Sequence, residues 1–546
     1  MSNEEIARRL ERHGVLLEIS GANTFRCAAF RKAADAVRSV DYPLAETPTA
    51  AELVAIPGVG KGIAAAIAEL LDGGTFSDHE TLTAEYPEGL IALVELPGIG
   101  PKRVATLHKE LGIQDLETLK AAVDDGRIAA TSGLGPKVAA TIASGLDQLK
   151  ERSGRWTIGD ARPLALLLAE GLSGETGHIV EVAGALRRWE ELVSGIDLVA
   201  VGTLTNVAAA AMRLPNVESV EEQGKQIRAA ITQGIPVSIT PTPGSAFGTT
   251  LIEITGPAEH VDALALNGVD FATEQAAYAS RGLPVVPPEL RGDPEVLQRI
   301  SEIDDLITVA DIRGQLHLHS EWSDGASPIQ DMVNAADLLG YVYLAVTDHS
   351  HSLGVANGLD RDRLKQQEAE IRSLGRKPHI FTGSEVEVRS DGRLDFDDET
   401  LASLGCVVAS IHSGLTKPRE ELMRRAEKTL RNPHVDILAH PSGRLLNRRE
   451  GGDFDWPALV GIAAETGTAL EINADPARLD LNVAHAKMAL EAGCLLVINC
   501  DAHAPGGFST IDYGVMVARK AWARPDQVIN TWPLAKLRKW LAQRGS

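Results

Sequence analysis

The sequence predicts a multidomain protein, in which a helical region is followed by a mixed α+β region and then by an α/β region of barrel type. Three observations predict this fold class. The chain has 546 residues, and single hydrophobic cores rarely grow beyond about 250 to 300 residues. A helix, a G-x-G turn and a second helix recur three times before residue 150. In the last third of the chain, apolar runs of strand length alternate with helical segments, which indicates parallel strands joined by helices.

The composition limits the classes of partner. The net charge of −22 argues against a generally basic nucleic-acid-binding surface, but it is compatible with a local phosphate-binding site or a metal site. The four cysteines form no C-x-x-C pair, which favours a reducing compartment. The amino terminus carries no apolar targeting segment, and no apolar run approaches the ~18 residues of a membrane span. We therefore expect a soluble cytoplasmic protein without a membrane partner, and a monomer is favoured.

The repeats of the first region are typical of helix-hairpin-helix motifs, and they span Leu53–Leu71, Leu93–Leu111 and Ile128–Leu149. The glycines let the backbone turn tightly and present N–H groups at a helix start to a phosphate. Because such contacts carry no base-sequence information, the repeats predict sequence-independent binding to the DNA backbone. The acidic surroundings leave a helical protein-interaction module as an alternative. The candidate DNA-binding residues are Gly58, Gly60, Lys61, Gly98, Gly100, Lys102, Arg103, Gly133, Gly135 and Lys137.

A composition change near Ser153 begins a mixed region. Its strand-like runs are His178–Val182, Leu198–Val201, Pro236–Thr240 and Thr250–Ile254. The string GALRRWEELVSGIDLVAV, from Gly184 to Val201, resembles the nucleotidyltransferase palm of family X DNA polymerases, in which G-S and two basic residues precede D-x-D. The segments Phe247–His260 and Tyr278–Arg291 resemble the thumb of the bacterial members.

The palm-like segment departs from the family pattern at its carboxylates. Phosphoryl transfer with two metals needs clustered carboxylates, and of the family's three aspartates only Asp197 is present, since the other two positions carry Gly195 and Ser238. We therefore expect a palm that no longer polymerises. Its two basic residues remain able to contact phosphate, and a spacer domain is the alternative. The positions of this degenerate polymerase site are Ala185, Arg187, Arg188, Gly195, Asp197 and Ser238.

The seven apolar runs of the last region each end in a side chain that can bind a metal or a phosphate. Barrels place their active sites at the carboxyl ends of the strands, so these side chains are expected to meet. The helical segments Asp331–Gly340, Trp456–Gly467 and Asn482–Gly493 lie between the runs and end in glycine, a helix stop signal. Trp532–Arg544 reads as a closing helix. The residues at the strand ends are His317, His319, Asp348, His349, Glu385, His412, His440, Glu471, Asn473, Asp501 and His503.

These strand ends resemble the polymerase and histidinol phosphatase (PHP) domain, which folds as a distorted seven-stranded βα barrel and holds up to three metal ions. H-x-H with a following Asp, T-D-H-S, G-S-E, S-I-H, A-H-P and D-A-H occur in the family's order. Together with the hairpins and the palm, they resemble the bacterial family X DNA polymerases that carry a C-terminal PHP domain, over nearly the whole chain. The metal ligands that the resemblance implies are His317, His319, Asp324, His349, Glu385, His412, His440, Asp501 and His503.

This ligand set predicts hydrolysis of a phosphoester. With Glu385 as the bridge, it can hold two to three cations, and its many histidines favour Mn²⁺, or Zn²⁺ or Fe²⁺, over Mg²⁺. We expect Glu385, His440 and Asp501 to be essential to catalysis. Arg444 is a candidate for binding the substrate phosphate, because a guanidinium matches pairs of oxygens; a solvated charge run is the alternative. Asp348 is a candidate for orienting its neighbour His349.

The attached regions point to DNA as the substrate, and we expect a metal-dependent DNA phosphodiesterase without polymerase activity. The family resemblance implies a 3'-5' exonuclease or a 3'-end processing enzyme in DNA repair. A small-molecule phosphatase of the histidinol phosphate type and a non-catalytic DNA-binding repair scaffold are the alternatives.

Six regions are expected along the chain. They are 1–80 (first hairpin), 81–152 (second and third hairpins), 153–255 (degenerate palm), 256–292 (thumb), 293–312 (linker) and 313–546 (PHP domain).

Overall fold

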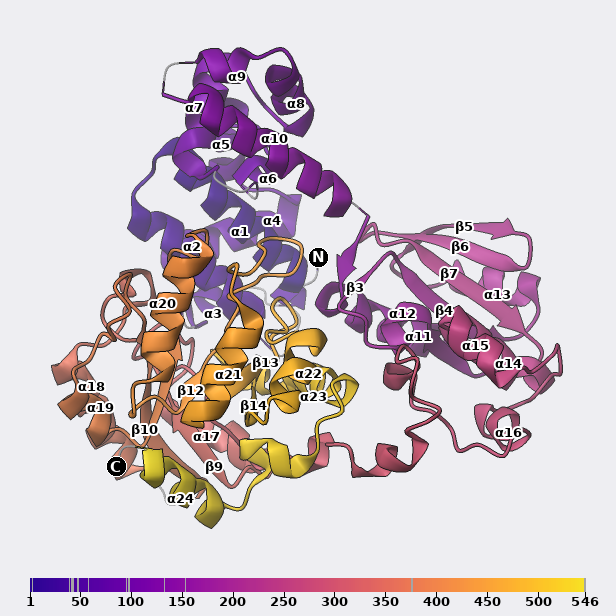
Figure 1. The fold of residues 1–546 in the computed structure, drawn as a ribbon. Coiled ribbons are helices and arrows are strands. Elements are labelled where there is room, and N and C mark those ends of the chain that lie inside the picture. The colour runs from indigo at the N-terminus through magenta and orange to yellow at the C-terminus, as the bar shows by residue number, and fades with distance from the viewer. Residues whose placement is uncertain are drawn as a thin grey trace. The chain divides into compact units, whose positions relative to one another are not determined.

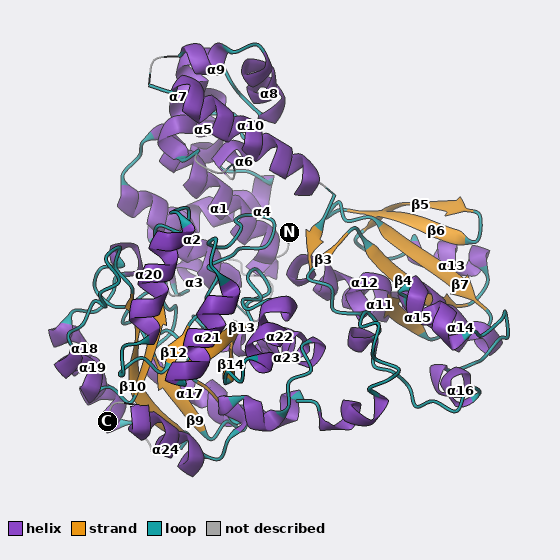
Figure 2. Ribbon diagram, viewed as in Figure 1, coloured by secondary structure: helices purple, strands orange, loops and turns teal. Residues whose placement is uncertain are grey.

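The computed structural model divides the chain into two compact units, Met1–Ser153 and Gly154–Ser546. Figure 1 shows the course of the chain, and Figure 2 shows that the first unit is helical whereas the second holds all the strands. The residues that the structure describes are 1, 3–38, 40, 44–46, 49–56, 58–94, 96, 99–131, 133–152, 154–374 and 377–544.

The first unit consists of helices around two hydrophobic clusters. One cluster lies within the first four helices, the other within the later ones, and α1 contributes to both. The helices are α1 (Asn3–Ser20), α2 (Thr24–Arg38), α3 (Ala50–Val54), α4 (Lys61–Gly73), α5 (Ser77–Glu85), α6 (Leu90–Val94), α7 (Pro101–Leu111), α8 (Leu116–Asp124), α9 (Arg127–Ala130) and α10 (Gly135–Arg152), with a 3₁₀ turn at Leu44–Glu46.

The three predicted hairpins are confirmed as the pairs α3/α4, α6/α7 and α9/α10. Their turns use glycine where another residue would be strained: φ is 88° at Gly58 and 84° at Gly133, in the left-handed region that glycine adopts readily. Gly60 and Gly100 are the N-caps of α4 and α7. Gly98, which we also predicted to bind DNA, lies outside the described residues.

The second unit begins with a five-stranded mixed sheet of order β2-β4-β7-β6-β5, in which β4 and β7 are parallel and the other pairs are antiparallel. Helices α11, α13 and α14 pack on this sheet, and the short strands β1 and β3 pair beside it. The elements are β1 (Trp156–Thr157), α11 (Ile158–Thr176), β2 (Val180–Ala183), α12 (Gly184–Arg187), β3 (Leu192–Val193), β4 (Ile196–Val201), α13 (Leu204–Ala211), β5 (Val217–Gln223), β6 (Gln226–Ile231), β7 (Val237–Thr242), α14 (Phe247–Thr255), α15 (Ala258–Leu264) and α16 (Glu274–Ala279), with 3₁₀ turns at Gly244–Ala246 and Pro288–Leu290.

One predicted strand of this region is wrong. The run Thr250–Ile254 lies in helix α14, whereas the other three runs overlap β2, β4 and β7. Helix α14 is buried on two sides, because Leu251 packs in a cluster with strand residues and Ile252 packs in the cluster of the thumb-like segment. In a short helix with two buried faces, apolar residues follow one another in the sequence instead of recurring every three or four positions. Such a sequence is easily mistaken for a buried strand.

The rest of the second unit is the predicted barrel of seven parallel strands, in the order β8 to β14. A parallel bridge between Leu318 and Ala502 nearly closes it. Its interior cluster is capped by Trp532 and Leu537, the latter on the predicted closing helix. The strands are β8 (Gly314–Gln315), β9 (Tyr343–Val346), β10 (His379–Glu387), β11 (Cys406–Ser410), β12 (Ile437–Leu438), β13 (Ala469–Asn473) and β14 (Leu496–Asn499).

Helices surround the strands of the barrel (Figure 2). They are α17 (Ile329–Leu338), α18 (Arg361–Ser373), α19 (Asp398–Ser403), α20 (Arg419–Leu430), α21 (Trp456–Thr466), α22 (Val483–Glu491), α23 (Ile511–Lys520) and α24 (Leu534–Arg544). Short 3₁₀ segments lie at Ile300–Asp305, Val309–Asp311, Gly354–Ala356, Pro505–Thr510, Pro525–Gln527 and Ile529–Thr531.

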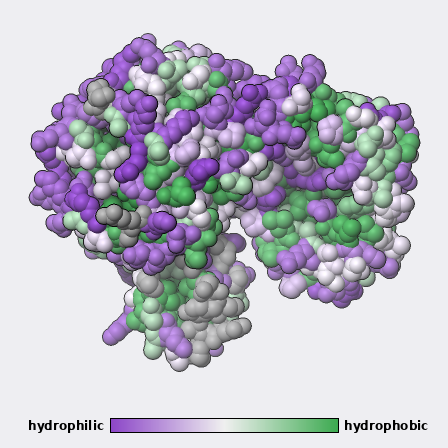
Figure 3. Space-filling model, turned by 90° about the horizontal axis from the view of Figure 1, so that it is seen from below, coloured by the Kyte–Doolittle hydropathy of each residue, from purple (hydrophilic) through white to green (hydrophobic). Residues whose placement is uncertain are grey.

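The surface is polar over much of its area. The face in Figure 3 is largely hydrophilic, with apolar side chains in patches between polar ones. Within the described parts of the chain, no helix combines the length and the apolar character that a membrane span requires.

Candidate metal centre

All of the residues implied as metal ligands follow the carboxyl ends of the barrel strands, or lie at such an end, and the structure brings them together. Their ligand atoms form four overlapping groups, in each of which the atoms lie within 4.8 Å of one another. The groups are His319, Asp324, His349 and His503; His317, Glu385 and His440; His317, His319 and Asp501; and His349, Glu385 and His412.

Glu385 stands at the centre of these groups. Its Oε2 lies 2.8 Å from His349 Nδ1 and 3.4 Å from His317 Nε2. Its Oε1 lies 3.0 Å from His440 Nε2 and 3.3 Å from His412 Nε2. The carboxylate therefore faces imidazoles that follow four different strands, as a bridging ligand would.

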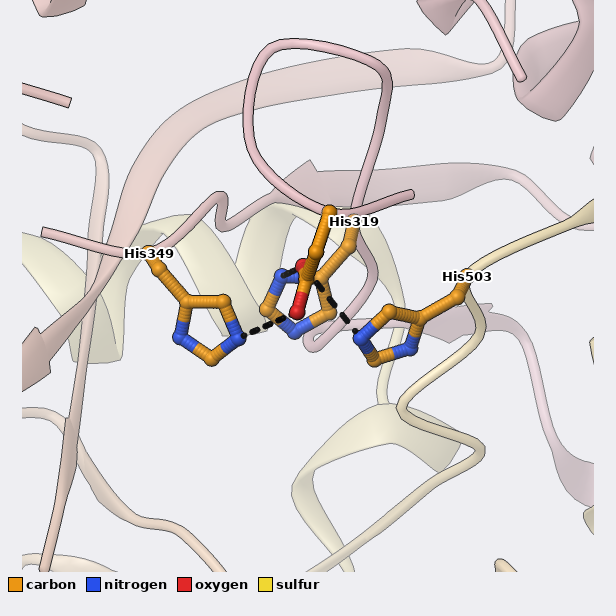
Figure 4. A group of neighbouring side chains, drawn as sticks. His319, His349 and His503 are labelled. Carbon is orange, nitrogen blue, oxygen red and sulfur yellow. Dashed lines mark ion pairs between the residues drawn. The ribbon is translucent and has the colours of Figure 1, made fainter. Parts of the chain in front are cut away.

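Asp324 is the carboxylate of a second group. Its oxygens lie 3.4 Å from His349 Nε2, 3.4 Å from His503 Nε2 and 3.8 Å from His319 Nδ1. Figure 4 shows the rings of His319, His349 and His503 turned toward this shared carboxylate. The loop that follows β8 thus supplies both an imidazole and a carboxylate to one group.

The donor atoms of the cluster fit metal ions. Buried polar atoms in proteins almost always have a hydrogen-bond partner, and leaving one without a partner is costly. Imidazole nitrogens and carboxylate oxygens are also ligands that Mn²⁺, Zn²⁺ and Fe²⁺ accept. The buried side-chain atoms of the cluster that lack a hydrogen-bond partner are His317 Nε2, His319 Nδ1 and Nε2, Glu385 Oε2, His440 Nδ1 and Asp501 Oδ1.

The electrostatics of the cluster also favour cations. Burial raises the pKa of Glu385, but the neighbouring imidazoles of His349 and His412 outweigh it and hold this pKa well below its usual range. Burial lowers the pKa of His349, but the carboxylates, Glu385 first, raise it to about 10. The anionic carboxylates therefore hold a proton on the His349 imidazole, and divalent cations would be attracted by the same charges in place of that proton.

Two carboxylates beside the cluster orient its imidazoles. Glu471 Oε1 lies 2.8 Å from His317 Nδ1, and Glu387 Oε2 lies 2.7 Å from His412 Nδ1. Each contact fixes one ring nitrogen, so that the other is directed to the cluster. We had placed Glu471 at a strand end without assigning this role, and we had missed Glu387. Glu387 lies two positions after Glu385, so both side chains leave the same face of β10. This spacing is visible in the sequence and could have identified Glu387.

The Asp348 side chain forms hydrogen bonds with the loop that follows β8 and does not orient its neighbour His349. The carboxylate of Asp348 accepts hydrogen bonds from the Ser320 N–H at 2.8 Å, from the Ser320 hydroxyl at 2.6 Å and from the Ser323 N–H at 3.1 Å. The Gln367 amide also donates to it. Asp348 thereby holds the turn that leads to Asp324.

Two members of the cluster have backbone conformations that side chains other than glycine rarely adopt. The φ angle is 27° at His440 and 52° at Asp501. Such conformations cost on the order of 1–3 kcal/mol and persist where the surroundings hold them. At His440, the backbone N–H donates to Glu471 Oε2 at 2.8 Å. The fold thus maintains strain at two of the three residues that we expect to be essential.

Arg444 is engaged by another part of the protein. Its guanidinium makes two bonds to the carboxylate of Glu191, of 3.0 and 2.6 Å, and a further bond to the Leu479 carbonyl. The predicted phosphate contact of Arg444 stays a prediction, and it would have to compete with this ion pair.

The positions of the polymerase site lie together but supply one carboxylate. Asp197 on β4 is paired in register with Ser238 on β7. A Cβ atom at Gly195 would lie 2.7 Å from the Pro236 carbonyl oxygen, so position 195 has no room for an aspartate without a backbone shift. Burial raises the pKa of Asp197, and the nearby charges of Arg228 and Arg188 offset this only in part.

The two basic residues of the palm contact the thumb-like segment. Arg187 makes two bonds to Glu274, of 2.9 and 2.6 Å, and Arg188 donates to the Thr255 carbonyl. Arg291 lies 2.8 Å from the same Glu274 carboxylate. We had expected both palm residues to be able to contact phosphate; in the structure their guanidinium groups hold the palm to the following segment.

The basic residues beside the hairpin turns are exposed at helix starts. Lys61 opens α4, Lys102 and Arg103 lie in the first turn of α7, and Lys137 lies in the first turn of α10. Backbone N–H groups at these helix starts can bind phosphate oxygens. DNA contacts at these positions stay a prediction.

The barrel and its clustered side chains define a PHP-domain protein, and a PHP domain model matches residues 315–475. A helix-hairpin-helix domain model matches residues 1–76, and a SAM-like helix-hairpin-helix tandem model matches residues 90–148. The DNA polymerase/3'-5' exonuclease PolX of Bacillus subtilis (strain 168) is 38% identical over 570 aligned residues, with 99% of each chain covered. The chain therefore belongs to the PolX family of family X DNA polymerase/3'-5' exonucleases, and the predicted resemblance is confirmed.

Other relatives match a smaller share of the chain. A probable phosphatase of Shewanella sp. (strain MR-4) is 27% identical, with 42% of this chain and 91% of that protein covered. A probable phosphatase of Thermoanaerobacter sp. (strain X514) is 25% identical, with 42% and 94% covered. These matches cover nearly the whole of each relative but less than half of this chain.

Proposed function

We propose that this chain is a metal-dependent 3'-5' exonuclease, or 3'-end processing enzyme of DNA repair, that has lost polymerase activity. One contrast supports the proposal. Every ligand position that the PHP resemblance implies is filled, and the filled positions converge. The palm, by comparison, retains Asp197 alone of its three carboxylates.

The barrel residues would hold two to three metal ions, and the many imidazoles favour Mn²⁺, Zn²⁺ or Fe²⁺ over Mg²⁺. Metal ions in such a site activate water for attack on phosphorus and stabilise the departing oxygen. Glu385 belongs to two of the ligand groups and would be the residue to bridge two ions. Glu471 and Glu387 fix His317 and His412 in orientation.

The loss of polymerase activity rests on three features of the palm. Position 195 has no room for a second carboxylate. Ser238 carries a hydroxyl where the family carries the third aspartate. Arg187, next to the segment that would grip a nucleotide, is bound by Glu274. The Bacillus relative is named for both activities, and we infer that this chain keeps the exonuclease alone.

Digestion of labelled DNA tests the proposal. The full chain is incubated with single-stranded, gapped and recessed DNA, labelled at the 3' or 5' end, with Mn²⁺, Zn²⁺, Fe²⁺ or Mg²⁺. We expect immediate release of the 3' label, a ladder of progressively shorter 5'-labelled products, loss of both with a chelator and recovery with Mn²⁺. Release of the 5' label first would reverse the polarity, and hydrolysis that survives the chelator would exclude the metal centre.

The relatives named probable phosphatases favour a small-molecule phosphatase as the second candidate, because the matched part of this chain covers more than 90% of their length. Histidinol phosphate offered in parallel with the labelled DNA separates the two. Preferential hydrolysis of histidinol phosphate would favour the phosphatase. Normal DNA binding without hydrolysis of either compound would instead favour a non-catalytic repair scaffold.

A further inference from the structure

The loop that carries His440 is tied to the middle region through an ion pair and through a hydrogen bond from the Asn447 amide to the Arg155 carbonyl, of 2.9 Å. Arg444, four positions after His440, pairs with Glu191 through two bonds: Nη1 to Oε1 at 3.0 Å and Nη2 to Oε2 at 2.6 Å. The Arg444 side chain is 13% exposed. A two-bond guanidinium–carboxylate pair fixes orientation as well as distance, and low exposure reduces its screening by solvent.

This loop has a conformation that needs support. His440 has φ of 27°, and its carbonyl accepts the Gly443 N–H at 2.8 Å. The carboxylate of Asp480 accepts the N–H groups of Ser442 and Gly443, at 3.0 and 2.8 Å. These contacts all come from the barrel. The ion pair of Arg444 with Glu191 holds the same loop from outside the barrel, four positions after His440.

Glu191 belongs to a palm segment that packs on the barrel as a whole. The ring of Trp189 lies edge-on to Tyr513 of α23, with centroids 5.5 Å apart. Glu190 pairs with Lys520 at 3.2 Å, at the end of the same helix. The segment directly after the degenerate nucleotide-binding turn therefore contacts the barrel at consecutive positions, and Glu191 alone of these contacts the metal-centre loop.

We propose that Glu191 is a positioning residue for the PHP metal centre, acting through Arg444 to hold the loop that places His440. This inference rests on the proposed metal-dependent function and deepens it, because it gives the degenerate palm a role in that site. Without the Glu191 carboxylate, Arg444 keeps the Leu479 carbonyl as a partner. It loses the two bonds that fix the orientation of its guanidinium group.

Direct measurement of Mn²⁺ binding tests the proposal without relying on catalysis. Mn²⁺ is titrated into the metal-free full chain by isothermal calorimetry, for the parent and for Glu191→Gln. Supporting contacts of metal ligands typically contribute about 10- to 100-fold in affinity. We expect at least one Mn²⁺ site of Glu191→Gln to weaken by about tenfold, with an unchanged far-ultraviolet circular dichroism spectrum. The matched control is Glu190→Gln, which removes the neighbouring ion pair of the same segment and should leave Mn²⁺ affinity at the parent value.

Arg444→Gln and the double variant test the route of the effect. If Glu191 acts through Arg444, adding Glu191→Gln to Arg444→Gln weakens Mn²⁺ binding no further. Parent-like Mn²⁺ affinity in Glu191→Gln, equal weakening in Glu190→Gln, or additive effects in the double variant would each overturn the proposal. A parent chain that binds Mn²⁺ but digests no DNA would overturn the proposed function and leave these binding comparisons intact.

Discussion

At the scale of single residues, burial decides what each carboxylate of the barrel can do. Glu385 is 1% exposed and faces five imidazoles, so its charge cannot be screened by water and must be balanced within the site. Glu471 is fully buried as well, but its oxygens are taken by His317 and the His440 backbone. The two buried glutamates thus differ in role. Both carboxylate oxygens of Glu471 have hydrogen-bond partners, whereas Oε2 of Glu385 has none among the described residues.

The positions of these residues were predictable from sequence, whereas their division of labour was not. The strand-end motifs placed His440 and Asp501 in the cluster because each follows an apolar run. The two-bond contact of Arg444 with Glu191 joins positions more than 250 residues apart, and no local pattern records such a pairing. A single sequence therefore predicts which side chains lie together in the cluster. It does not predict which distant residues form hydrogen bonds or ion pairs with them.

Asp501→Asn should nearly abolish DNA hydrolysis. The change keeps the size of the side chain but removes the charge that faces His317 and His319, at 3.4 and 3.0 Å. We expect a decrease in kcat of about 10²-fold or more, since loss of a metal ligand exceeds the loss of a supporting contact. The measurement is the initial rate of 3'-label release with saturating Mn²⁺. Asp512→Asn, an exposed aspartate on α23, is the control, and equal rates for Asp501→Asn and the parent would contradict the assignment.

At the scale of elements, the predictions succeeded where burial is uniform. All barrel strands except β10 are buried along their whole length and read as apolar runs bounded by turns. The hairpin β5/β6 was missed, because β5 (VESVEEQ) is largely exposed and rich in glutamate. Helix α14 was misread for the opposite reason, since two of its faces are buried.

The first turn of α7 gives a prediction about DNA binding. Lys102 is exposed beside the turn that precedes this helix, where a phosphate would approach. Lys102→Ala should weaken binding equally for different DNA sequences and reduce the slope of log Kd against log salt by about 0.7–0.9. Fluorescence anisotropy at several salt concentrations measures both quantities. Lys120→Ala, which removes an exposed lysine from α8, should change neither, and an unchanged slope in Lys102→Ala would exclude a phosphate contact there.

The thumb-like segment contains a buried histidine that makes stability depend on pH. Burial, and then the charge of Arg291, lowers the pKa of His260 to about 4, and its ring contacts the Tyr278 hydroxyl at 2.7 Å. In the unfolded chain this pKa returns to about 6.5. The unfolded state therefore binds the extra proton between these values, so His260 reduces the free energy of unfolding as pH falls from about 6.5 to about 4.

His260→Gln should remove this dependence. Between pH 7.5 and pH 5, we expect the parent to lose more stability than the variant, at a rate of up to about 1.4 kcal/mol per pH unit for one proton. Urea midpoints at a series of pH values measure the difference. His178→Gln, at an exposed position, should retain the parent's slope. A variant that is less stable at all pH values but has the parent's slope would show that His260 does not titrate in this way.

At the scale of the whole chain, the proposed function separates the two candidate chemistries. The barrel keeps a converging ligand set, while the palm keeps one carboxylate and offers the Trp189–Glu191 segment to the barrel. A palm that contributes packing and an ion pair can be retained without its own reaction, because these contacts need its fold and not its catalytic aspartates.

This separation predicts that Asp197→Ala changes neither reaction. Asp197 lies opposite Ser238 in the sheet register, and neither Ser238 nor Gly195 offers a second carboxylate with which to hold two metals. We expect the parent to show no primer extension with deoxynucleotides and Mg²⁺ or Mn²⁺. We expect Asp197→Ala to release the 3' label within about twofold of the parent rate, because Asp197 belongs to none of the ligand groups of the barrel. A family member with both activities provides the positive control for extension. Extension by the parent that Asp197→Ala abolishes would show that the single aspartate still supports polymerisation.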